Sequence, residues 1–159
     1  MADLAGRRIL VTGAGKGIGR ATVRLLAGYG AHIIAVGRTG ADLESLAQET
    51  GCDTVEADLA DAGAVDGIIA RAGQVDDLVN CAGTTTLEAA SDFRGATFDE
   101  IMAVNVRAPM ALSRDFARQA IDRAAAAASS TYPASRPPSA FATTSSIVPP
   151  RARSMRPRA

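Results

Sequence analysis

The sequence is poor in several residue types, and each shortage narrows the possibilities. Its 159 residues include no tryptophan, one histidine, two cysteines and a single lysine, Lys16. Cys52 and Cys81 lack metal-ligand spacing, so we expect free thiols and no metal site. The formal net charge of zero offers no field for nucleic acid or anionic membranes. No apolar run approaches the roughly 18 residues of a membrane span, and the opening is too briefly apolar for a signal peptide. We expect a cytoplasmic protein without nucleic-acid or membrane partners.

What is present, up to about Arg123, is a regular alternation of short apolar runs with helical patterns. With 47% hydrophobic and 21% charged residues, the composition is that of one soluble domain. The pattern predicts strands at 7–13, 31–37, 52–58 and 75–83 and helices at 20–30, 41–50, 62–73 and 97–123. Such alternation indicates an α/β fold, a parallel sheet with helices on both faces.

Between the first predicted strand and helix lies TGAGKGIG, residues 12–19. Gly13, Gly17 and Gly19 let the backbone turn sharply and approach a pyrophosphate, and a helix that begins near Ile18 offers free N–H groups. A loop of this kind can also be a plain turn. Because it follows a strand and precedes a helix, we predict a dinucleotide-binding loop.

The end of the second strand distinguishes NAD from NADP. An acidic residue there binds the ribose hydroxyls of NAD, whereas an arginine accommodates the 2′-phosphate of NADP. This chain has Arg38 at that place, and Lys16 in the glycine loop adds a second cation. Arg38 alone can be a solvated strand-end residue, but the two cations together favour NADP(H).

Three more stretches accompany the glycine loop: VEADLAD after the third strand, LVNCAG after the fourth, and IMAVNVRAP in the last helical pattern. Together with VTGAGKGIGR they resemble the short-chain dehydrogenase/reductase family, most closely its NADP-dependent carbonyl and L-xylulose reductases. The resemblance covers residues 4–123, about half of a family domain. It implies a Rossmann-like, doubly wound sheet truncated to about four strands, and NADP(H)-dependent reduction of a small carbonyl substrate or sugar ketone.

The resemblance also implies roles for single residues. Asn105 matches the asparagine of the catalytic tetrad, which in the family holds a water of the proton relay; an asparagine at a helix kink is the alternative. Cys81 replaces the second asparagine of the family's Asn-Asn-Ala-Gly motif. The cofactor-binding residues implied are Gly13, Lys16, Gly17, Ile18, Gly19, Arg38, Thr39, Asp58, Leu59, Asn80, Ala82 and Gly83.

The other members of the tetrad, a serine and a Tyr-x-x-x-Lys pair, have no match. In the family the lysine lowers the pKa of the tyrosine, which acts as general acid; here no lysine follows Lys16. Tyr132 and Arg136 share the spacing, but their segment has no apolar stripe on which to build a helix. We therefore expect the chain to be inactive. A non-catalytic nucleotide-binding module and an unstable pseudogene product are the alternatives.

Residues 124–159 differ from the preceding chain in composition. Five alanines are followed by a segment rich in Ser, Pro and Arg, and the stretch contains no acidic residue. If the codons of this segment are read one base out of register, they can encode the family's fifth strand, which ends in the catalytic serine. They can also encode a Tyr-Cys-Ala-Ser-Lys string, and the Ser-to-Tyr and Tyr-to-Lys spacings are then those of the family. We interpret the segment as a frameshifted, disordered tail; a natural low-complexity tail is the alternative. A domain that ends at residue 123 would leave helix 97–123 partly uncovered, so we do not expect the family's homo-oligomer.

Overall fold

The computed structural model describes residues 4–87 and 89–129. In this part of the chain, four parallel strands form one sheet in the order β3-β2-β1-β4. The predicted α/β class is confirmed, because the apolar runs form a parallel sheet whose two central strands are largely buried. The strands are β1 (Arg8–Thr12), β2 (His32–Gly37), β3 (Asp53–Glu56) and β4 (Asp77–Val79).

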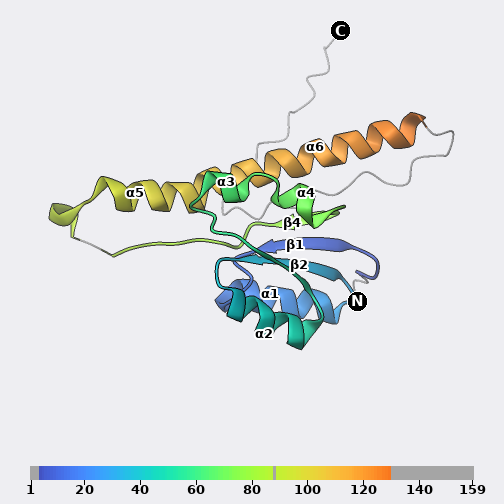
Figure 1. Ribbon diagram of the computed structural model, residues 1–159, viewed down its shortest axis with the longest axis horizontal. Coiled ribbons are helices and arrows are strands. Elements are labelled where there is room, and N and C mark those ends of the chain that lie inside the picture. The colour runs from blue at the N-terminus through green and yellow to red at the C-terminus, as the bar shows by residue number, and fades with distance from the viewer. Residues whose placement is uncertain (1–3, 88, 130–159) are drawn as a thin grey trace, which may run out of the picture.

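Helices cover both faces of the sheet, as expected of a doubly wound fold. Figure 1 shows α1 and α2 on one face and α3, α4 and α6 on the other. No helix in the described ranges is both long enough and apolar enough to cross a membrane. The helices are α1 (Gly17–Gly28), α2 (Gly40–Thr50), α3 (Ala62–Val65), α4 (Ile68–Ala72), the 3₁₀-helix η1 (Ala90–Asp92), α5 (Gly95–Met102), the π-helix η2 (Ala103–Arg107) and α6 (Ala108–Ser129).

The two faces of the sheet carry separate cores. Because side chains alternate along a strand, Ile9 and Val11 of β1 point toward α1 and α2, where they join Leu43 and Leu46. Leu10 belongs to the opposite cluster. Both clusters are buried, so the central strand is enclosed between two helical layers.

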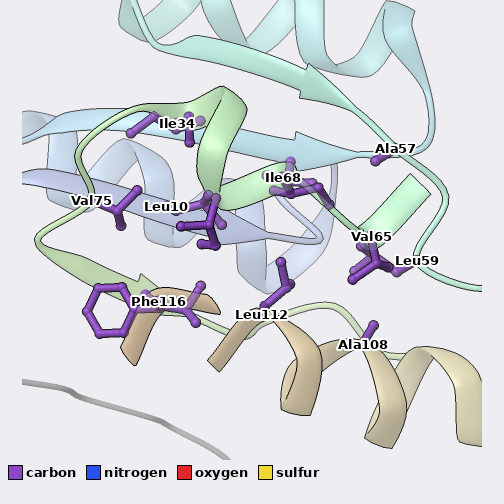
Figure 2. Close-up of a cluster of buried hydrophobic side chains, with 14 residues drawn as sticks. Leu10, Ile34, Ala57, Leu59, Val65, Ile68, Val75, Ala108, Leu112 and Phe116 are labelled. Atoms are coloured by element: carbon purple, nitrogen blue, oxygen red, sulfur yellow. The ribbon is translucent and has the colours of Figure 1, made fainter. Parts of the chain in front are cut away.

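The opposite cluster is closed by α6. Leu112 is fully buried and Phe116 is 5% exposed, and Figure 2 shows both side chains directed at the sheet with Leu10. Met110, on another side of the same helix, is 69% exposed. The helix is therefore partly buried, as expected. Its side toward the sheet is covered, whereas Met110 faces solvent.

The observed strands are shorter than the predicted ones, and the helices differ from the sequence-based expectations in three further ways. The pattern at 62–73 forms two short helices because Gly67 adopts a left-handed conformation (φ 82°) between them. The pattern at 97–123 is interrupted by η2. Helix α6 continues past Arg123 to Ser129, through a run of alanine, the residue with the highest helix propensity. The rest of the expected tail, with Tyr132 and Arg136, lies outside the described residues.

Candidate cofactor-binding site

The carboxyl ends of the four strands meet at a cleft of about 450 Å³. Parallel α/β sheets bind their ligands at this edge, because the loops that follow the strands converge there. Every residue predicted to bind a cofactor lines the cleft except Asn80. The residues that line the cleft are Gly13, Gly15, Lys16, Gly17, Ile18, Gly19, Gly37, Arg38, Thr39, Asp42, Ala57, Asp58, Leu59, Cys81, Ala82, Gly83, Thr84 and Val104.

The glycine loop is shaped by close backbone approach. Gly13 has φ 65°, and a Cβ atom there would lie 2.7 Å from the Cα of Ala82. A Cβ on Gly19 would collide with the carbonyl oxygen of Gly13. Lys16, the N-cap of α1, makes no side-chain capping bond, so the first N–H groups of the helix are not capped by it. The loop thus leaves room and backbone donors for an anion.

Thr12 holds the neighbouring loop in place, a role that the sequence reasoning missed. It is 1% exposed, and its Oγ1 accepts hydrogen bonds from the backbone N–H groups of Cys81 and Ala82, both at 3.1 Å. This hydroxyl therefore fixes the loop after β4 against the glycine loop. Its only signal in the sequence is a polar residue at the end of an apolar run.

Both cations and carboxylates line the cleft. The Nζ of Lys16 lies 3.1 Å from Oδ2 of Asp42, and the Lys16 side chain is 76% exposed. Arg38 is also exposed. On the β3 side, Oδ1 of Asp58 accepts a hydrogen bond from the N–H of Ala60 at 2.9 Å. Asp42 was not among the predicted residues, although an acid in the first turn of a helix is a common stabilising feature.

Asn105 lies in the π-helix η2, at the point where α5 and α6 join. Its Oδ1 accepts from the N–H of Thr84 and its Nδ2 donates to the carbonyl of Thr84, both at 2.8 Å. The side chain therefore clamps the loop after β4 to the helix. The position of Asn105 at a helix irregularity agrees with the alternative of an asparagine at a helix kink. Its role in a proton relay stays a prediction.

Asn80 and Cys81 follow β4, and of the two only Cys81 lines the cleft. Asn80 donates from Nδ2 to Oγ of Ser113 at 3.4 Å, while its Oδ1 is buried without a partner among the described residues. The thiol of Cys81, which is free like that of Cys52, has a pKa raised by burial, so it stays protonated at neutral pH. No group of three potential metal-ligating side chains occurs in the described ranges.

Comparisons with known proteins agree with this geometry. The family model for short chain dehydrogenase matches residues 7–128. L-xylulose reductase of Mesocricetus auratus is 49% identical over 123 residues, 77% of this chain and 50% of that protein. Carbonyl reductase (NADPH) 2 of Sus scrofa is 43% identical over 76% of this chain and 50% of its own length.

A solved structure shares the arrangement. A metagenomic short-chain oxidoreductase in complex with NADP aligns at a TM-score of 0.70 with 31% identity, covering 77% of this chain and 59% of that one. The chain spans about half the length of the curated relatives that it matches.

Proposed function

Because the chain belongs to the short-chain dehydrogenase/reductase family, we propose that its cleft binds NADP(H). The observation that carries the proposal is the pair of exposed cations, Lys16 and Arg38, at the rim of a glycine-lined cleft. Two charges of the same sign beside the end of β2 suit the 2′-phosphate that distinguishes NADP from NAD.

The remaining lining fits the other parts of the cofactor. Gly13 and Gly19 leave no room for a Cβ atom, so the backbone itself forms the wall of a pyrophosphate site at the start of α1. Asp58 and Leu59 lie at the end of β3, where they border the site of an adenine ring. The clamp between Asn105 and Thr84 supports the loop beside the nicotinamide end. When bound, the nicotinamide supplies hydride chemistry.

By lineage the activity is NADPH-dependent reduction of a small carbonyl compound or sugar ketone. The relatives named above are reductases of such substrates by their names. The 159-residue sequence itself offers no Tyr-x-x-x-Lys pair, since Lys16 is its only lysine. We therefore propose that this chain, assayed alone, binds the cofactor but does not reduce carbonyl substrates.

Nucleotide titration tests the binding proposal. We expect the chain to bind NADPH more tightly than NADH, and Arg38→Asp to reduce the preference by roughly ten- to a hundredfold, because charge-assisted hydrogen bonds contribute about 1.5–3 kcal/mol. Arg118→Asp is the matched control, since Arg118 carries the same charge but does not line the cleft. Unchanged selectivity in Arg38→Asp would contradict the proposal.

A turnover assay tests the second part of the proposal, that the chain does not reduce carbonyl substrates. We expect no oxidation of NADPH above a buffer blank with L-xylulose or a small dicarbonyl compound, because no general acid is positioned by a lysine, and such catalysis contributes about 10² to 10⁴-fold. Steady turnover at enzyme rates would contradict the expected inactivity. Failure of both nucleotides to bind would instead favour an unstable, non-functional product.

A further inference from the structure

The charged residues of the cleft do not all favour a phosphate. Among the described residues that line it, the charged ones are Lys16, Arg38, Asp42 and Asp58. Asp58 is engaged in the turn to Ala60. Asp42 is different, because its carboxylate lies in direct contact with the lysine ammonium, at 3.1 Å. One of the two cations that would read the 2′-phosphate therefore already has an anionic partner.

The Asp42 carboxylate is held at the rim by its backbone. Asp42 belongs to the first turn of α2, and its carbonyl accepts a hydrogen bond from NH1 of Arg20 at 3.3 Å. Arg20 is itself held by Glu49, at 2.9 Å. A Cβ atom on Gly15 would stand 3.1 Å from the Cβ of Asp42, so the glycine loop packs directly on this turn.

The side chains of Lys16 and Asp42 differ in how far they can move. The Asp42 side chain is 26% exposed, whereas that of Lys16 is 76% exposed at the end of a flexible stem. The ammonium can therefore leave the carboxylate to meet a phosphate, but the carboxylate cannot move far from the phosphate. Both the lost ion pair and the repulsion between two anions count against the phosphorylated cofactor.

We propose that Asp42 is a specificity-determining residue that limits the preference for NADP(H) over NAD(H). The inference rests on the proposed function of the cleft. The 2′-phosphate carries a charge of about −1.5 to −2 at neutral pH and competes with Asp42 for Lys16. NAD(H) has a 2′-hydroxyl instead, which is not repelled and can donate to a carboxylate. Asp42 thus weakens NADPH binding while leaving NADH binding intact.

Asp42→Asn is the direct test, because it removes the charge and keeps the size of the side chain. Dissociation constants of the full chain for NADPH and NADH are measured by fluorescence titration. We expect NADPH affinity to rise about three- to tenfold and NADH affinity to stay within about twofold. Glu44→Gln is the matched control, because Glu44 is an exposed acid on the same helix that does not line the cleft.

Two further variants sharpen the test. Asp42→Ser removes the same charge with another residue suited to a helix start, so that poor folding of one variant does not decide the result. In a Lys16→Met background the gain from Asp42→Asn should shrink, because part of it comes from the release of the ammonium. A gain of equal size in that background would overturn the competition for Lys16.

The remaining outcomes separate this inference from the proposed function. If the unsubstituted chain prefers NADPH and both Asp42 variants leave that preference unchanged, the inference fails and the proposed function stands. Weaker NADPH binding in both variants would mean that Asp42 positions Lys16, which also overturns the inference. If the unsubstituted chain binds neither NADPH nor NADH, the proposed function fails and the inference fails with it.

Discussion

The two ends of the sheet use charge in opposite ways. At the amino ends of the strands, Arg7 holds Asp77 through contacts of 2.6 and 2.9 Å, and Arg123 of α6 lies 3.0 Å from Asp76. These carboxylates are largely buried, with 15% and 22% of their side chains exposed. At the carboxyl ends, the cations at the rim are exposed, and the ion pair of Lys16 is open to solvent.

This difference shows what holds each end together. Partly buried charge pairs with several hydrogen bonds fix the amino ends, where no ligand is expected. The carboxyl ends are held instead by glycine contacts and by the hydroxyl of Thr12. Because close backbone packing holds this end together, Lys16 and Arg38 stay exposed at the rim, where cations can recognise a phosphate.

The largest expected effect comes from breaking the packing at the carboxyl end. Gly13→Ala places a Cβ atom 2.7 Å from the Cα of Ala82 at a residue with φ 65°. We expect a loss of about 2–4 kcal/mol in the free energy of unfolding, because both the left-handed conformation and the overlap cost energy. NADPH binding should be lost as well. Urea denaturation and nucleotide titration measure the two effects.

The control for this substitution is another glycine. Gly28→Ala, in α1, meets no atom within 4 Å and should be neutral or stabilising, since alanine is the better helix former. Equal stability of the Gly13→Ala and Gly28→Ala proteins would show that the contact with Ala82 does not constrain the loop.

The next effect comes from breaking the ion pair at the amino end. Asp77→Ala leaves the guanidinium of Arg7 without its two-point partner, and we expect a loss of about 1–3 kcal/mol in the free energy of unfolding. The ratio of NADPH to NADH affinity should not change, because the pair lies at the far end of the sheet. Chemical denaturation and titration test both statements, with Asp99→Ala, an exposed acid on α5, as control. A shift in cofactor preference would show that the two ends are coupled.

The features predicted from sequence are those encoded by neighbouring residues. Strand runs, the glycine loop and Arg38 lie in short local patterns, and the fold and its order of elements follow from them. Thr12 was missed because its hydrogen-bond partner Cys81 is 69 positions away. Asp42 was missed for a related reason, since its contact with Lys16 depends on how α2 packs on the glycine loop.

Other differences reflect competing local signals. The left-handed conformation of Gly67 divides one predicted helix into two, although the apolar spacing continues through it. Beyond Arg123 the change in composition suggested a tail, but helix propensity carries α6 on to Ser129. In both cases the backbone preferences of glycine and alanine determine where the helix ends. The sequence-based prediction had placed the ends from apolar spacing and composition instead.

The smallest effect is a dependence on pH at the amino end. Burial alone would raise the pKa of Asp76, but hydrogen bonds from the N–H of Arg8, from Gln74 and from Arg123 outweigh it and lower the pKa. A carboxylate with a lowered pKa stabilises the fold above its ordinary value near 4, and this stabilisation is lost as the pH falls through the lowered value.

Asp76→Asn should therefore flatten the acid side of the stability profile. Urea unfolding at neutral pH and at acidic pH values below 4 should show that the unsubstituted chain loses more stability on acidification than the variant, because the variant has no charge to lose at this site. Asp99→Asn serves as control, since it removes a carboxylate that is exposed on α5. If Asp76→Asn and the unsubstituted chain lose stability in parallel, the hydrogen bonds to Asp76 do not distinguish its charged form, and the amino end is held by the pair of Arg7 and Asp77 instead.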